Sequence, residues 1–302
     1  MSGSPQRLGP RQVPLWIRLL SPRMNLAGFA GAVLLLVVLV TGLAAPLLTR
    51  QPPNAQDLLV RLRPPGFSSA GEVPHPLGTD QLGRDILSRI IHGARVSLIV
   101  AMTSVVLSGA AGVLLGLLAG FYGRRMDTTV MRLADLQLAF PFLLLAMSLV
   151  AVLGTGMWYL VLALGIANWV SYARVVRGSL LSLRERAFVE AARAVGASDR
   201  RLLFRHILPN LLGPVIVVAT LSVSRMIIAE SSLSFLGLGV PPEIPSWGGM
   251  LSDGRSYIYT AWWLTAFPGL AIMLTVLGAN FFGDGIRDLL DPQFFTRRIR
   301  TG

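Results

Sequence analysis

Long uncharged apolar runs constrain this chain more than any other feature, because each is long enough to cross a bilayer as a helix of about 20 residues. The third run is broken at Gly154-Thr155-Gly156, which indicates a tight turn between two spans. We therefore predict an all-α membrane protein with six transmembrane helices. The uncharged runs are Met24–Thr49, Val96–Gly123, Leu136–Ala173, His206–Ser224 and Ser256–Gly283, and the predicted spans are 26–48, 96–121, 131–153, 157–176, 209–236 and 262–283.

The first run raises the alternative of a cleaved signal peptide. Its apolar stretch is longer than the usual 7–15 residues. No clear small-x-small cleavage pattern follows it. We interpret 26–48 as a retained first span.

The chain has no cysteine and no lysine, and all 27 basic residues are arginine. Without cysteine, disulfides, thiol nucleophiles and cysteine metal sites are excluded. Without lysine, the chain cannot carry a phosphate-binding loop of the G-x-x-x-x-G-K-[ST] kind, so another chain must bind any ATP used in that manner. The three histidines are too scattered for a metal site, and we expect no cofactor and no catalytic residues.

A net charge of +12 is large enough for a nucleic-acid-binding protein, but the distribution of the charge along the chain indicates a membrane protein instead. Most arginines fall in alternate segments between the spans, at 1–25, 124–132, 174–205 and 286–302. The positive-inside rule places such segments in the cytoplasm. Both termini are therefore predicted to be cytoplasmic, and no nucleic-acid partner is expected.

The predicted outer loop at 49–94 begins with a proline-rich stretch and ends with an amphipathic pattern. Ile86 and Ile90 belong to an apolar set at helical spacing, and Asp85 and Arg89 are four residues apart. We expect a short helix on the outer face that leads into the second span. Two interpretations stay open for it, an interfacial anchor and a docking surface for an external partner.

A charged insert at 184–209 is typical of a helix–turn–helix. Residues 184–195 are rich in Ala and Arg and lack Pro and Gly, which favours a helix. Gly196 follows where a helix end favours a left-handed residue, and Ser198 is suited to cap a second helix. We expect that helix to end at Pro209, where the chain turns into the fifth span.

The first helix of this insert carries small apolar side chains on one side. Small side chains allow a partner surface to approach closely, as when a helix lies in a groove. The alternative is a solvated loop that merely satisfies the positive-inside rule. The side chains concerned are Ala187, Ala191, Ala192 and Val195.

The same insert resembles the EAA loop of ABC importer permeases, whose pattern is E-A-A-x3-G-x9-I-x-L-P. His206 occupies the isoleucine position, with Ile207 beside it, and this is the one departure. We refer to residues 184–209 as the EAA segment. The matching residues are Glu190, Ala191, Ala192, Gly196, Leu208 and Pro209.

Two further stretches, 75–98 and 230–251, resemble the second permease subunit of the dipeptide and oligopeptide branch, the DppC/OppC type. Nickel and glutathione permeases look similar. The resemblance implies the six-helix fold of type I ABC importer permeases. It also implies a multi-pass protein of the bacterial cytoplasmic membrane.

The resemblance implies a divided importer. A homologous second permease completes the pore, two P-loop ATPases bind ATP, and an extracytoplasmic binding protein delivers the substrate. The EAA helix lies in a cleft of one ATPase, with Glu190 and Gly196 at the contacting turn. The expected cargo is a di- or oligopeptide moved by alternating access, with nickel or glutathione as alternatives. The expected organisation is 1–25 cytoplasmic tail, 26–48 first span, 49–94 outer loop with amphipathic helix, 95–285 permease domain and 286–302 cytoplasmic tail.

Two ionisable residues, Arg225 and Glu230, fall within or at the outer end of the fifth span. Such groups are costly in a membrane and usually face a cavity or a partner. Five residues apart on a helix, they point about 140° from each other and are not expected to pair. One interpretation puts Glu230 at the outer interface with Arg225 snorkelling, and the other puts one or both at the pore or at a subunit interface.

Two other function classes predict different features. A stand-alone channel or secondary transporter predicts intramembrane polar sites and internal symmetry, and no internal repeat is evident. A membrane enzyme requires a convergent set of catalytic side chains, which the three histidines do not supply. The ABC permease is the function that the sequence favours.

Overall fold

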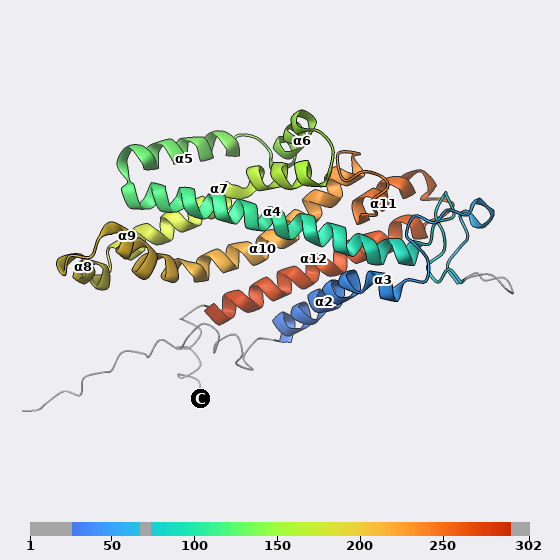
Figure 1. Ribbon diagram of the computed structural model, residues 1–302, viewed down its shortest axis with the longest axis horizontal. Coiled ribbons are helices and arrows are strands. Elements are labelled where there is room, and N and C mark those ends of the chain that lie inside the picture. Colours follow the sequence, from blue (N-terminus) through green and yellow to red (C-terminus); the bar gives the residue numbers. More distant parts are fainter. Residues whose placement is uncertain (1–25, 67–73, 291–302) are drawn as a thin grey trace, which may run out of the picture.

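The computed structural model describes residues 26–66 and 74–290, and these form an elongated bundle of helices (Figure 1). The predicted tail at 1–25 lies outside the described residues, as does most of the tail predicted at 286–302. The elements are α2 (Leu26–Leu43), α3 (Ala45–Leu48), η1 (Leu58–Val60), α4 (Ile86–Tyr122), α5 (Arg124–Leu138), α6 (Phe142–Leu153), α7 (Met157–Arg184), α8 (Ala187–Ala194), α9 (Asp199–Arg201), η2 (Leu202–Ile207), α10 (Leu208–Phe235), α11 (Trp247–Gly254), η3 (Arg255–Tyr257) and α12 (Trp263–Leu290).

The described residues contain five helices that are long and apolar enough to cross a membrane, or six if the bent pair α5–α6 counts as one span. Five of the predicted spans correspond to α2, α4, α7, α10 and α12. Gly154 and Gly156 adopt φ values of +106° and +142°, so the predicted turn between α6 and α7 is confirmed. The all-α prediction with six spans agrees with this architecture.

The third predicted span, 131–153, is not one straight helix. α5 and α6 are bent by 94° at the break between them. Pro141 precedes α6, and proline restricts the residue before it to extended conformations, so a helix rarely continues through that position. The hydropathy averaged over the uncharged run that begins at Leu136 is insensitive to a single proline, so it does not indicate the break at Pro141.

The short outer helix predicted near 85–95 is the beginning of α4 rather than a separate element. Asp85 caps α4 by accepting a hydrogen bond from the Ser88 N–H at 2.7 Å. The helix then runs unbroken to Tyr122, about 55 Å at 1.5 Å per residue. This exceeds the hydrocarbon core of a bilayer, so α4 extends beyond the membrane.

One side of the first turns of α4 is covered by the loop before the helix and by α11. Arg89 Nη1 lies 2.6 Å from Asp80 Oδ2, and Arg84 Nε lies 2.5 Å from the same oxygen. Asp253 of α11 lies within 3.4 Å of both guanidinium groups. Arg89 is only 3% exposed, so its side of the helix is covered by the chain itself, and the interpretations as an interfacial anchor or a docking surface stay predictions for the other side.

A stripe of small side chains on α4 lets α7 pack directly against it (Figure 1). A Cβ atom added at Gly112 would lie 2.3 Å from the Trp169 carbonyl oxygen, so the two backbones touch there. In a membrane, the hydrophobic effect does not drive helices together, so they associate through close packing. Small residues three or four positions apart allow that packing. The buried small residues of the stripe that meet α7 are Ser104, Ser108, Gly112 and Gly116.

Helices α2 and α12 make a similar close contact through Gly31, where a Cβ would lie 2.5 Å from the Phe282 nitrogen. α2 begins and α12 ends on the same side of the bundle as α8 and α9 (Figure 1). α11 and the loop before α4 lie at the opposite end. We call these the α8 end and the α11 end.

Candidate functional site

The EAA segment projects from the α8 end of the bundle (Figure 1). Its inner face is anchored on the last turns of α4 and α7 and the first turn of α10. This anchorage fixes the position of the segment relative to the membrane helices. The buried residues that form this contact are Leu117, Phe121, Val176, Leu180, Leu183, Val189, Ala192, Leu202, Ile207 and Leu211.

The turn between α8 and α9 is closed by Gly196. This residue adopts φ +81°, and the Ala197 N–H donates to the Ala192 carbonyl at 3.0 Å. That bond and the left-handed residue form a Schellman motif, which favours glycine. Ser198 then caps α9 by accepting from the Arg201 N–H at 3.4 Å. The helix–turn–helix predicted for this segment is confirmed.

Pro209 does not end the second helix, contrary to the prediction. α9, η2 and α10 follow one another without a break and form one candidate span from Asp199 to Phe235. η2 is a π-helical stretch just before the proline. Proline is tolerated in the first turn of a helix, and a π-bulge relieves the helical hydrogen-bond pattern next to it. The EAA segment is therefore continuous with the α10 span.

The motif residues divide into exposed and buried sets. Glu190, Ala191, Gly196 and Pro209 are exposed, and Leu208 is half-buried. Ala192 is only 9% exposed and faces the core of its own chain. The predicted apolar side for a partner is therefore smaller than expected, and it consists of Ala187, Ala191 and Val195.

Two aromatic side chains on the EAA segment were missed from the sequence. Phe188 is 40% exposed and Phe204 is 59% exposed, and Val195 on the same segment is 85% exposed. Phe204 also lines a shallow hollow of about 440 Å³ together with Ser198, Arg200 and Arg201. Aromatic residues inside a charged insert are a signal that was available in the sequence. Exposed apolar side chains rimmed by arginines are typical of a protein-binding surface.

Glu230 is enclosed within the chain. Its side chain is 0% exposed. Oε2 accepts from the Ser97 hydroxyl at 2.9 Å and from Ser231 at 3.3 Å, and Oε1 accepts from Ser234 at 2.8 Å. Glu230 is therefore buried between α4 and α10, and the interpretation that put it at the outer interface is wrong.

Arg225 lies on the exposed side of α10 and rests against α7. Its Nη1 donates to Asn168 Oδ1 at 3.4 Å and to Ser171 Oγ at 3.3 Å. Asn168 is held in turn by donating to the hydroxyls of Ser108 at 3.2 Å and Ser222 at 3.5 Å. Arg225 and Glu230 thus have separate partners, as their spacing predicts.

Comparison with known proteins identifies the family to which this architecture belongs. Residues 112–296 match the family described as "Binding-protein-dependent transport system inner membrane component". The chain is 45% identical over 269 residues to the "Di/tripeptide transport system permease protein DppC" of Pseudomonas aeruginosa, covering 89% of each chain. It is 38% identical to the "Dipeptide transport system permease protein DppC" of Haemophilus influenzae, covering 97% of this chain and 99% of that protein.

The fold is also found in a solved transporter. A chain of the inward-facing MetNI methionine ABC transporter superposes with a TM-score of 0.57 over 68% of this chain and 98% of that one. The two sequences are 18% identical, so this likeness concerns the fold alone.

The helical bundle and the EAA segment define a multi-pass membrane transport subunit rather than an enzyme. The chain belongs to the family of binding-protein-dependent transport system inner membrane components, the permease subunits of ABC transporters. The match at 112–296 includes the whole EAA segment and Arg225.

Proposed function

We propose that this chain is a pore-forming subunit of an ATP-driven importer that carries di- and oligopeptides across the bacterial cytoplasmic membrane. The observation that carries the cargo is the 45% identity to a di/tripeptide permease over 89% of the chain. A homologous second permease completes the pore in this proposal. An extracytoplasmic binding protein delivers the peptide.

Two separate P-loop ATPases supply the energy. The absence of lysine supports this division of labour, because a phosphate-binding loop of the usual kind needs one. The contact with an ATPase is the exposed turn of the EAA segment, with Glu190, Ala191 and Gly196 at its surface. Ala192 and Leu208 pack in the apolar cluster beneath that turn, and Pro209 lies in the first turn of α10.

The continuity of the EAA segment with α10 suits a mechanical coupling. Movement of α8 and α9 by an ATPase is transmitted to the span because η2 and α10 follow without a flexible link. Closure of the ATPases then rotates the spans between inward-facing and outward-facing states. ATP at one end and the loaded binding protein at the other bias this equilibrium.

The orientation follows from this assignment. The α8 end faces the cytoplasm, and α2 begins and α12 ends there too (Figure 1). Both termini are then cytoplasmic, and 49–94 forms the outer loop between the first span and the permease domain at 95–285. Arg225 faces the pore or the second permease, whereas the burial of Glu230 gives it a role inside this subunit.

Uptake by the reconstituted complex tests the cargo. Proteoliposomes that contain both permeases and ATPases, with binding protein and ATP supplied, are expected to accumulate radiolabelled Ala-Phe. Excess unlabelled dipeptide should abolish the signal, and omission of ATP should do the same. Competition by nickel or glutathione, without competition by dipeptides, would contradict the peptide assignment while leaving the importer mechanism intact.

A further inference from the structure

One side of α10 is left open by the other described helices. Its residues recur every three or four positions, so they lie on one face. Ile228 and Leu236 are 49% and 48% exposed, and Arg225 is exposed on the same face. The stripe consists of Leu221, Arg225, Ile228, Ser232 and Leu236.

The depth of Arg225 determines what this stripe can face. Arg225 lies about 15 Å along the helix axis from Phe235, the last residue of α10. A guanidinium at that depth is costly against acyl chains, so it faces water or protein. The stripe therefore borders the transport path or another subunit.

The charge of Arg225 is not neutralised within the described part of the chain. The acceptors of its hydrogen bonds, Asn168 and Ser171, are both uncharged. The acid on the same helix, Glu230, is enclosed by three serine hydroxyls on the buried side. A cation held in place by neutral groups, with its outer side open, is suited to bind an anion in its fork of N–H donors.

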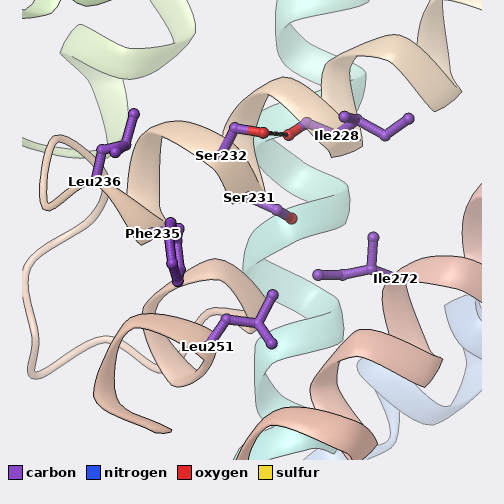
Figure 2. A pocket seen from close by; sticks show the side chains of 7 residues that line it. All are labelled: Ile228, Ser231, Ser232, Phe235, Leu236, Leu251 and Ile272. Atoms are coloured by element: carbon purple, nitrogen blue, oxygen red, sulfur yellow. Dashed lines mark hydrogen bonds between the residues drawn. The ribbon is translucent and has the colours of Figure 1, made fainter. Parts of the chain in front are cut away.

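An apolar hollow of about 420 Å³ lies farther along α10 toward the α11 end, and it is lined by residues of α10, α11 and α12 but not by Arg225 itself. Figure 2 shows Ile228 and Phe235 of α10, Leu251 of α11 and Ile272 of α12 around it. Ile228 belongs to both the hollow and the stripe, and it follows Arg225 by three residues, a rise of about 4.5 Å along the helix axis. The lining is largely apolar and the hollow is open on one side, so it suits a single apolar side chain rather than an enclosed ligand.

We propose that Arg225 and this hollow form a subsite for the C-terminal residue of the transported peptide, in which Arg225 binds the α-carboxylate and the hollow takes an apolar side chain. The inference rests on the peptide cargo proposed above. A guanidinium favours the carboxylate end of a peptide and repels its ammonium end. The apolar lining disfavours a charged C-terminal side chain, which would lose its hydration there.

Transport by the complete reconstituted complex tests the cation. Arg225→Gln is expected to reduce uptake of Ala-Phe by about tenfold or more, because a charge-paired hydrogen bond is lost. Arg225→Lys should retain most of the uptake. Uptake of Ala-Phe amide, relative to wild type, should change less than about twofold on either substitution, since it has no carboxylate to lose. Arg132→Gln, on exposed α5, is the matched control for loss of one arginine.

Leu251→Trp tests the hollow. It uses only peptides with a free carboxylate, so it remains informative if uptake of Ala-Phe amide is too low to measure. Filling the hollow should lower Ala-Phe uptake several-fold and spare Ala-Gly. Wild-type uptake of Ala-Phe by Arg225→Gln would overturn the subsite, as would equal loss of acid and amide. Loss of the second permease from Arg225→Gln complexes would assign Arg225 to the subunit interface instead. If wild-type complexes carry no peptide at all, the proposed cargo fails and the peptide subsite fails with it, whereas an Arg225→Gln complex that transports like wild type overturns the subsite alone.

Discussion

Gly112→Val is expected to prevent accumulation of the folded subunit. A Cβ at this position would lie 2.3 Å from the Trp169 carbonyl oxygen and 2.6 Å from the Tyr172 Cβ. Neither atom is at the end of a flexible side chain, so α4 and α7 must separate to admit valine. Overpacking of this kind costs about 3 kcal/mol or more, because α7 cannot repack its own backbone. The measurement is the yield and thermal unfolding midpoint of the detergent-purified protein.

Gly178→Val on α7 is the matched control, because a Cβ there has no described atom within 4 Å. Both variants replace a glycine by valine within a membrane helix, so the change in helix propensity is the same in the two proteins. Equal unfolding midpoints for the two variants would show that α4 and α7 do not pack through Gly112.

Glu190→Arg is expected to abolish ATP-driven uptake without loss of the folded subunit. Glu190 is exposed on α8, so the substitution leaves the core of the chain intact. It reverses the charge at the turn proposed to contact the ATPase, and reversal at a docking surface costs several kcal/mol of binding. The readouts are peptide uptake and thermal unfolding of the purified subunit.

Asp284→Arg is the control for this reversal, since Asp284 is also exposed and lies near the end of α12. Gly196→Trp should also abolish uptake, because the added ring extends from the turn and because φ +81° strains any side chain placed there. Wild-type uptake by Glu190→Arg and Gly196→Trp would contradict the coupling role.

Local features of the sequence were sufficient to predict the helices and the turn of the EAA segment. Hydropathy over about 20 residues locates spans because a bilayer leaves the backbone few alternatives. Gly196 and Ser198 act through hydrogen bonds to residues at most five positions away, so their roles follow from spacing alone.

Features that depend on distant segments were not predicted. Arg89 is buried because Asp253, 164 residues away, contributes to its ion pairs. The face of α8 that carries Ala192 turns inward because of how α7 and η2 meet, which local periodicity does not specify. The serine shell of Glu230 has the same origin, because Ser97 comes from α4. The glycines of α4, in contrast, follow a small-residue pattern that is visible in the sequence.

The most direct test of the central claim is gentle affinity purification of this chain from its membrane, with mass spectrometry of the proteins that remain bound. We predict a second multi-span permease and P-loop ATPases, with the ATPases lost from Glu190→Arg and Gly196→Trp and retained by Asp284→Arg. A stable, solitary chain that still transports peptide would contradict the account, because the EAA segment would then contact no motor.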